Sequence, residues 1–175
     1  MTPVLIVFSG LPGTGKSTLA QQLARRWRAA YLRVDSVEAA LLNAGHVGVT
    51  VEGYAVEYVV AEDNLHLGLS VVADCVNPVH ETRGAWAEIA RRTGSDLIDL
   101  EVICSNESEH RRRVETRRAD PGHHIGRWSP PGWPEIERYR QAYEPWETPP
   151  LVLDTAQGTQ QDNFAALLAL LGARG

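Results

Sequence analysis

The chain has 175 residues, of which 43% are hydrophobic and 22% are charged, and its formal net charge is −5. These values fit one globular domain with a sizeable core and argue against a disordered chain. The acidic balance also argues against a protein whose affinity comes mainly from neutralising nucleic-acid phosphates, although a local basic groove stays compatible with it.

The N-terminal segment gives no sign of membrane targeting. The apolar run at residues 4–8 closes at Ser9 and Gly10, so it is too short for a signal peptide, and no stretch of about 18 apolar residues follows. We therefore expect a cytoplasmic protein without membrane contacts. The two cysteines, Cys75 and Cys104, agree with a reducing compartment and are expected to be small buried side chains.

Short apolar runs alternate with helical patterns along the chain, which predicts an α/β fold. Most of the runs are apolar on both faces, as in a covered parallel sheet. Strands are expected at residues 4–8, 30–34, 70–74, 97–104 and 151–153. Helices are expected at residues 16–28, 36–44, 53–68, 79–93, 106–118 and 134–144, and around Phe164, Leu167, Leu168 and Leu171. Residues 119–134 are rich in proline and glycine, which predicts a loop with the character of a lid.

The first predicted strand runs into FSGLPGTGKSTLA, residues 8–20. Residues 10–17 match G-x-x-x-x-G-K-[ST] between a buried strand and an amphipathic helix, which predicts a phosphate-binding loop. The glycines let successive N–H groups point inward, and the helix start adds partial positive charge. Lys16, the only lysine among 17 basic residues, is expected to reach the β and γ phosphates. The expected nucleotide-binding residues of this loop are Gly10, Leu11, Pro12, Gly13, Thr14, Gly15, Lys16, Ser17 and Thr18.

Two aspartates end the second and third predicted strands, at the edge where open α/β sheets bind ligands. Asp35 can accept the proton of a hydroxyl that attacks the γ-phosphorus. The alternative is a capping box with Glu38 at the start of the following helix, and both roles are compatible. Asp74 is expected, with the Ser17 hydroxyl, to hold Mg²⁺ opposite the loop. Asn77, which precedes a proline, is most simply a helix N-cap.

Residues 109–118 contain five arginines. Arg113 and Arg117 share a helix face, so we expect them to bind the nucleotide, with Arg113 also neutralising the transferred phosphoryl group. The alternative is a solvated helix in which Glu109 pairs with Arg113. Arg127, inside the loop at 119–134, is a second candidate for the catalytic role.

Other side chains near this loop have two interpretations. His123 and His124 are adjacent and lack metal-ligand spacing, so they are expected in a mobile polar loop. Several aromatic residues either pack the loop against the domain or form a wall for a planar substrate. These residues are Trp128, Trp133, Tyr139, Tyr143 and Trp146.

The segment GLPGTGKSTLA, the strand-end acids Asp35 and Asp74, the arginine helix and the lid-like loop together resemble the small P-loop kinases. These include nucleotide, gluconate and adenylyl-sulfate kinases, chloramphenicol phosphotransferases and the kinase domain of polynucleotide kinases. The resemblance covers nearly the whole chain and implies a five-stranded parallel sheet of order 2-3-1-4-5 flanked by helices. In that order Cys75 and Cys104 are about 10 Å apart, beyond disulfide reach.

The resemblance also implies a single domain over residues 1–175, with ATP and Mg²⁺ as cofactors. The expected activity is transfer of the γ-phosphoryl group to a hydroxyl of a small molecule such as a nucleoside, sugar or antibiotic-like compound. VDS around Asp35 is similar to the segment that holds the catalytic base of chloramphenicol phosphotransferases. The expected catalytic residues are Lys16, Asp35, Arg113 and Arg127. The alternatives are a polynucleotide 5′-hydroxyl kinase and a regulatory nucleotide-binding module without catalysis.

Overall fold

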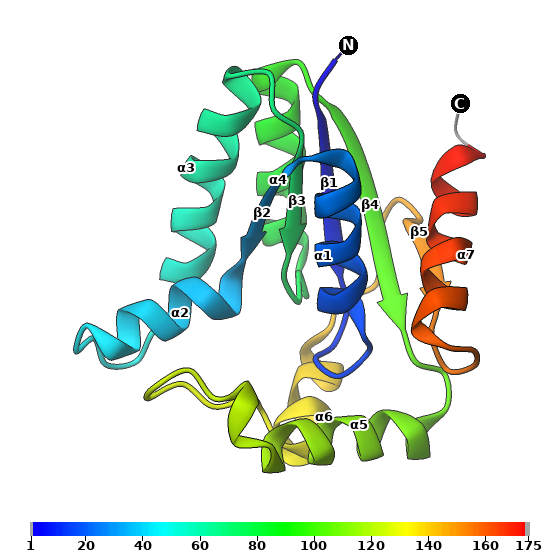
Figure 1. The fold of residues 1–175 in the computed structure, drawn as a ribbon. Coiled ribbons are helices and arrows are strands. Elements are labelled where there is room, and N and C mark those ends of the chain that lie inside the picture. The colour runs from blue at the N-terminus through cyan, green and yellow to red at the C-terminus, as the bar shows by residue number, and fades with distance from the viewer. Residues whose placement is uncertain (1, 174–175) are drawn as a thin grey trace.

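The computed structural model describes residues 2–173, and its centre is a five-stranded parallel sheet in the order β2-β3-β1-β4-β5 (Figure 1). The predicted sheet order is therefore confirmed. Because β1 pairs with both β3 and β4, its carboxyl end lies at the middle of the sheet edge. The strands are β1 (Val4–Ser9), β2 (Ala30–Arg33), β3 (Val71–Asp74), β4 (Asp96–Ile103) and β5 (Leu151–Asp154).

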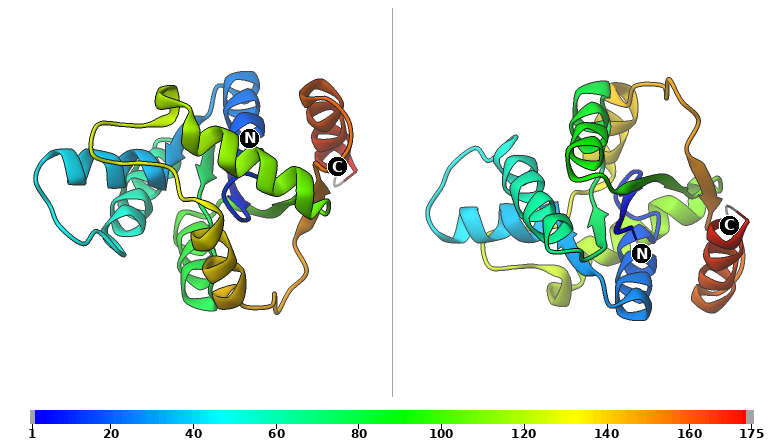
Figure 2. Two further views of the ribbon diagram at one scale, coloured as in Figure 1. Left: turned by 90° about the horizontal axis from the view of Figure 1, so that it is seen from below. Right: turned by 90° about the horizontal axis from the view of Figure 1, so that it is seen from above.

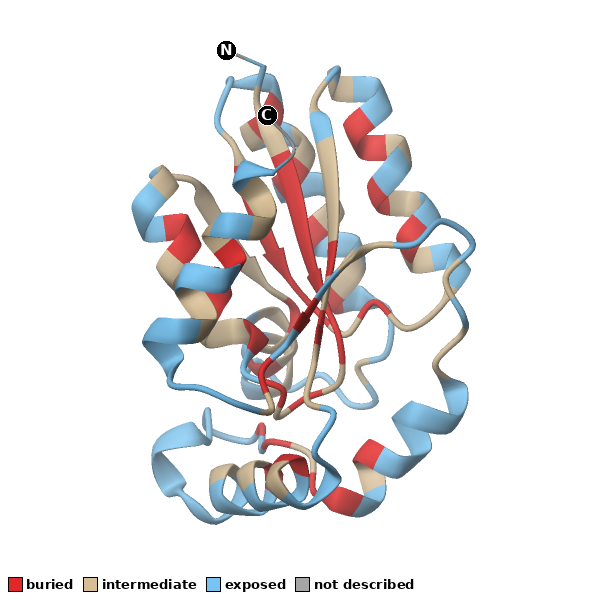
Figure 3. Ribbon diagram, turned by 90° about the vertical axis from the view of Figure 1, so that its right-hand side faces the viewer, coloured by how far each residue is buried: buried red, intermediate tan, exposed pale blue. Residues whose placement is uncertain are grey.

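Both faces of the sheet are covered by helices, as the apolar strands predict. Alternate residues of β1 point to opposite faces: Leu5 and Val7 pack against α3 and α4, whereas Ile6 and Phe8 pack against α1 and α7. Figure 3 shows buried residues gathered in the central strands and on the helix faces that turn toward them. The covering helices are α1 (Lys16–Trp27), α3 (Glu52–His66), α4 (His80–Thr93) and α7 (Gln160–Gly172).

The remaining elements lie beyond the carboxyl edge of the sheet. In the view from below in Figure 2, α5 (yellow-green) crosses in front of the loop between β1 and α1. The segment that follows α5 reaches α2. Ile125 and Trp128 exchange backbone hydrogen bonds of 3.0 and 3.1 Å at the tip of this segment. The elements here are α2 (Val34–Asn43), α5 (Glu107–Ala119), the 3₁₀ turn η1 (Pro121–His123) and α6 (Trp133–Ala142).

The start of α2 differs from the prediction. This helix begins at Val34, directly after β2, and its N-cap is Arg33, which makes no side-chain capping bond. Asp35 therefore lies within the first helical turn, and the predicted capping box with Glu38 is wrong. Arg33 is the last residue of β2 with a partner in β3, and that partner is Asp74.

The predicted N-cap role of Asn77 is also wrong. α4 begins three residues later, at His80, with Val79 as its N-cap. Asn77 has a φ angle of +51° and donates from Nδ2 to Ser9 Oγ at 2.9 Å. This asparagine is thus tied to the end of β1 instead of to the helix.

The expectation of buried cysteines is confirmed for Cys75 and not for Cys104. Cys75 is buried, Cys104 is half-buried, and both are free thiols. Within residues 2–173, no helix combines the length and apolar character needed to cross a bilayer.

Candidate active site

The loop between β1 and α1 has a backbone that favours glycine. Gly10, Gly13 and Gly15 all have positive φ angles, a region that L side chains rarely adopt. Gly13 also has no room for a side chain, because a Cβ at this position would lie 2.5 Å from Cγ2 of Val114 on α5. Glycine thus stands where the loop turns and where it touches α5.

Two side chains outside the loop hold its backbone in place. His110 on α5 is 2% exposed, and its Nε2–H donates to the Pro12 carbonyl at 2.8 Å. Burial lowers the pKa of His110, so the neutral imidazole is favoured. Thr155, which follows β5, donates from Oγ1 to the Thr14 carbonyl at 2.6 Å. The sequence analysis missed both contacts, which join segments 98 and 141 residues apart.

A cavity of about 350 Å³ opens where the loop meets α1. Within the described residues its charged side chains are basic and no carboxylate lines it. Gly13, Gly15, Lys16, Ser17, Thr18, Gln21, Arg33, Arg113, Arg117 and His123 line this phosphate cavity. A concave site of one charge sign concentrates ions of the opposite sign. The cavity is therefore suited to a polyanion such as a phosphate chain.

Asp74, at the end of β3, lies beside Lys16 and is 2% exposed. Its Oδ1 is 4.0 Å from Lys16 Nζ, and its Oδ2 accepts a hydrogen bond of 2.7 Å from the Tyr31 hydroxyl. Burial and the nearby Asp74 raise the pKa of Tyr31, so the phenol keeps its proton and donates. Tyr31, another residue that the sequence analysis missed, thus orients the Asp74 carboxylate.

The donors beside Lys16 fit a magnesium ion. The Ser17 hydroxyl and the Asp74 carboxylate are hard oxygen ligands, which Mg²⁺ prefers. Among residues 2–173, no three His, Cys, Asp or Glu side chains gather as a complete metal site. Mg²⁺ at this place would therefore take further oxygen ligands from phosphates and water, as is usual for this ion.

Asp35 lies between two guanidinium groups. Its Oδ2 is 2.7 Å from Arg33 Nη2 and 3.4 Å from Arg117 Nη2. Burial by itself raises the pKa of Asp35, but Lys16, Arg33 and Arg117 outweigh this effect and hold the pKa below its usual range. The group is therefore an ionised carboxylate at neutral pH.

A second cavity, of about 580 Å³, has Asp35 in its wall. Glu38 also lines it from α2, and Tyr54, Trp128 and Tyr139 contribute aromatic rings. Ser129 and Pro131, which like Trp128 belong to the predicted loop at 119–134, also line the cavity. In the small P-loop kinases that the sequence resembles, the acceptor binds at the end of the second strand, and we name this space the acceptor cavity after that expectation.

Arg113 forms the ion pair weighed from the sequence and also borders the phosphate cavity. Its Nε donates to Glu109 at 2.7 Å, and its two terminal nitrogens donate to the Thr155 hydroxyl and carbonyl at 3.0 and 2.9 Å. The Glu109–Arg113 pair therefore exists, and the guanidinium still lines the phosphate cavity.

Arg127 lies elsewhere. Its backbone N–H donates to Asn43 Oδ1 at 2.7 Å, and its Nη1 donates to the Leu42 carbonyl at 3.3 Å. Asn43 also donates from Nδ2 to the Ile125 carbonyl at 3.1 Å. The tip of the segment is thus fastened to the end of α2, and Arg127 is not among the described residues that line the phosphate cavity.

The five aromatic residues lie in three different places. Trp128 and Tyr139 line the acceptor cavity. Trp133 instead packs with Val114 and Ile136 beneath the loop. The remaining two, Tyr143 and Trp146, lie against the guanidinium of Arg83 at 5.1 and 4.0 Å from their ring centroids.

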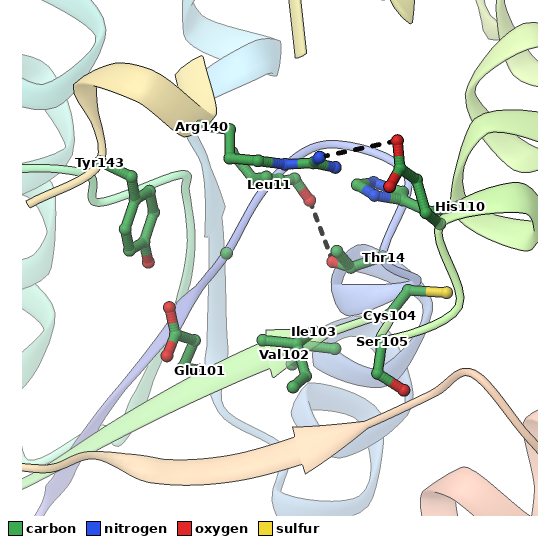
Figure 4. Close-up of a pocket in the computed structure, with 12 residues that line it drawn as sticks. Leu11, Thr14, Glu101, Val102, Ile103, Cys104, Ser105, His110, Arg140 and Tyr143 are labelled. Carbon is green, nitrogen blue, oxygen red and sulfur yellow. Dashed lines mark hydrogen bonds and ion pairs between the residues drawn. The ribbon is translucent and has the colours of Figure 1, made fainter. Parts of the chain in front are cut away.

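A third cavity, of about 390 Å³, lies behind the loop (Figure 4). Gly10, Leu11 and Thr14 face this space, and the ring of Tyr143 points toward Glu101 in the close-up. Pro12 lines the acceptor cavity. These four predicted nucleotide-binding residues therefore border other spaces. Pro12 has no backbone N–H, and that of Gly10 donates to the Val76 carbonyl at 3.1 Å. Only the N–H groups of Leu11 and Thr14 remain as candidate phosphate contacts.

The sequence profile AAA_33, described as an AAA domain, matches residues 5–127. The chain belongs to this family. Together with its relatives, the match identifies it as a small P-loop kinase family member.

The relatives are similar over nearly their whole length. A protein of Aeropyrum pernix named "Probable adenylyl-sulfate kinase" is 26% identical, with 97% of this chain and 93% of the relative covered. A candidate kinase from Chloroflexus aurantiacus has the same fold with a TM-score of 0.77, 21% identity and 99% and 98% coverage. The Mycobacterium tuberculosis APS kinase CysC, solved with AMPPNP and APS, gives a TM-score of 0.66, 22% identity and 98% coverage of both chains.

Proposed function

We propose that this P-loop family member is an ATP-dependent phosphotransferase that moves the γ-phosphoryl group to a hydroxyl of a small molecule. The observation that carries the proposal is the position of Asp35. Its carboxylate reaches Arg33 and Arg117 of the basic phosphate cavity and also lines a separate cavity of about 580 Å³. A base between a phosphate site and a small-molecule site is the arrangement that phosphoryl transfer to a hydroxyl requires.

In the proposed mechanism the loop N–H groups and Lys16 hold the phosphate chain of ATP. Mg²⁺, held by Ser17 and Asp74 with the nucleotide, would supply charge neutralisation on the phosphate oxygens. Arg113 and Arg117 face the same space and compensate the negative charge on the transferred group.

Asp35 holds the acceptor hydroxyl in line with the γ-phosphorus. The hydroxyl oxygen forms the new P–O bond as the bond to the ADP oxygen breaks, and the hydroxyl proton passes to Asp35. A carboxylate of low pKa is a weak base, so its main contribution is orientation, with proton transfer late in a loose transition state.

We further propose that residues 119–134 form the lid of a single catalytic domain spanning 1–175. Trp128, Ser129 and Pro131 of this segment already border the acceptor cavity. Opening of the tip at Asn43 would admit the acceptor, and its closure would exclude water from the transfer. Arg127 has a route to the phosphates only through such a movement.

The variant Asp35→Asn tests the proposal. Turnover should fall at least a hundredfold, while the ATP dissociation constant measured by calorimetry should stay within about twofold. Asp63→Asn, on the exposed side of α3, is the matched control and should behave as wild type. γ-labelled ATP is tested against nucleosides, sugars, antibiotics and 5′-hydroxyl oligonucleotides.

Four results would contradict the proposal. Absence of ATP binding would remove its basis, and full turnover by Asp35→Asn would remove the assigned base. ATP binding without transfer to any hydroxyl would favour the non-catalytic nucleotide-binding module. Selective transfer to oligonucleotide ends would instead identify a polynucleotide kinase.

A further inference from the structure

Glu38 is the second carboxyl group that α2 presents to the acceptor cavity. It follows Asp35 by three residues, so the two side chains share a helix face with Cβ atoms about 5–6 Å apart. This separation is comparable to the width of one six-membered ring. A small acceptor can therefore contact both groups at once.

The position of Glu38 is built into the packing of α2 against α3. A Cβ added at Gly53, in the first turn of α3, would lie 3.0 Å from Glu38 Cγ. The glycine thus leaves space for the glutamate side chain to pass. Burial and the neighbouring Asp35 raise the pKa of Glu38 to about 7, and a hydrogen bond from Trp128 opposes this shift.

Glu38 differs from the other acids of the cavity in lacking a cationic partner. Asp35 has Arg33 and Arg117, whereas no Lys or Arg side chain forms an ion pair with Glu38 in the part of the chain that the structure describes. A half-buried carboxyl with an elevated pKa gains a favourable interaction when a cation binds beside it.

The other charged groups around the cavity are already engaged. Glu135 accepts from the Gly132 N–H at 2.9 Å and from Arg138 at 3.1 Å. Arg118 donates to the Pro130 carbonyl at 2.8 Å. Behind the cavity wall, burial raises the pKa of Glu57 to about 9, so this carboxyl is neutral at physiological pH.

The aromatic lining favours the same ligand chemistry. Tyr54, Trp128 and Tyr139 surround the space into which Asp35 and Glu38 project. The face of an aromatic ring attracts a cation, as Trp128 already does with the guanidinium of Arg33, 5.8 Å from its ring centroid. An anionic group in the cavity would instead meet three carboxyl residues, with Arg118 as the one basic residue in the described lining.

We propose that the acceptor is a hydroxyl compound that carries a protonated amine, such as an amino sugar or an aminocyclitol. Asp35 holds the reacting hydroxyl, and Glu38 holds the ammonium group one ring width away. This inference rests on the proposed phosphotransferase function and narrows its acceptor class. It separates the chain from kinases whose acceptor is an anion, such as adenylyl sulfate.

The first experiment compares acceptors by charge. Kanamycin A, 2-deoxystreptamine and glucosamine are each compared with their N-acetylated forms, which keep hydroxyl groups and lose the positive charge. Binding is measured by calorimetry with a non-hydrolysable ATP analogue, and transfer with γ-labelled ATP. We expect binding of at least one amine that weakens tenfold or more on N-acetylation. Stronger binding of adenylyl sulfate, gluconate or neutral sugars than of any amine would overturn the inference.

The second experiment changes the protein. Glu38→Gln should weaken binding of the amine ten- to a hundredfold and leave both the ATP affinity and the binding of the N-acetylated compound within twofold. Glu88→Gln, on an exposed ion pair of α4 with Arg91, is the matched control. An equal loss for the charged and the acetylated compound would assign Glu38 a structural role and refute the proposal.

The two experiments separate this inference from the proposed function. Amine binding that depends on Glu38, without phosphoryl transfer, would refute the phosphotransferase and keep the amine site. Transfer to neutral or anionic hydroxyl compounds, without amine binding, would keep the phosphotransferase and refute the amine site. If Glu38→Gln fails to fold, the comparison of charged and acetylated compounds on the wild-type protein decides alone.

Discussion

The variant Gly13→Ala tests how tightly α5 is packed against the phosphate loop. An alanine at a positive φ angle costs about 1–2 kcal/mol. The new Cβ would also lie 2.5 Å from Val114 Cγ2 and 3.3 Å from the His110 ring, and both neighbours are 2% exposed. Overpacking of this kind costs about 1–3 kcal/mol. The free energy of unfolding should therefore fall by about 2–5 kcal/mol.

Gly15→Ala is the matched control for this prediction. Its φ angle of +90° is close to the +88° of Gly13, but the nearest atom to an added Cβ is Thr155 Oγ1 at 4.0 Å. Only the cost of the positive φ angle remains, so the free energy of unfolding should fall by about 1–2 kcal/mol. Urea unfolding without nucleotide, followed by tryptophan fluorescence, measures both values and avoids any effect of the new methyl groups on phosphate binding.

The steric part of the loss should depend on Val114. In the double variant Gly13→Ala with Val114→Ala, the space opened by the smaller side chain receives the new methyl group. The combined loss should be smaller than the sum of the two single losses by about 1–3 kcal/mol. Equal losses for the alanines at positions 13 and 15, or strict additivity with Val114→Ala, would show that the contact with α5 does not constrain the loop.

Three other variants each test the role of one side chain. Tyr31→Phe removes the 2.7 Å hydrogen bond to buried Asp74 and should lower the free energy of unfolding by about 1–3 kcal/mol, with Tyr139→Phe as the unaffected control. Glu57→Gln should flatten the pH dependence of stability. With a pKa of about 9 when folded and 4.5 as reference, Glu57 destabilises the protein increasingly from pH 5 to pH 8, by up to about 4 kcal/mol; an equal slope in both proteins under urea unfolding would contradict this. Asn43→Ala should speed amide exchange at residues 125–128 roughly tenfold, and unchanged exchange would show that Asn43 does not hold the tip of this segment.

The fold was predictable where local patterns carry it. The phosphate loop lies between a strand apolar on both faces and an amphipathic helix, and these signals are independent of distant contacts. The boundary at Val34 was not predictable in this way, because a β-branched residue after an apolar run continues a strand pattern. Pairing between β2 and β3 ends one residue before Val34, at Arg33 and Asp74, and no local sequence pattern specifies where this pairing ends.

The candidate site divides along the same line. The proximity of Lys16, Asp35 and Asp74 was predictable, because parallel strands bring their carboxyl ends to one edge. Tyr31 was within reach, since it shares a strand face with Arg33 near that edge. His110 was not, because its bond to Pro12 joins residues 98 positions apart and no local pattern specifies it.

The face that α5 turns toward the sheet edge connects the separate parts of the site. His110 bonds the phosphate loop, Arg113 bonds Thr155, and Arg117 bonds Asp35. Their spacing of three, four and seven residues places them on one helix face. From the sequence this face was interpreted either as a solvated, salt-bridged surface or as a source of nucleotide-binding arginines. In the structure each of the three contacts joins it to a different segment of the chain. Since the proposed lid begins where α5 ends, a lid movement that rotates α5 must disturb the loop and the base together. Acceptor binding and nucleotide binding should therefore be energetically coupled through this helix.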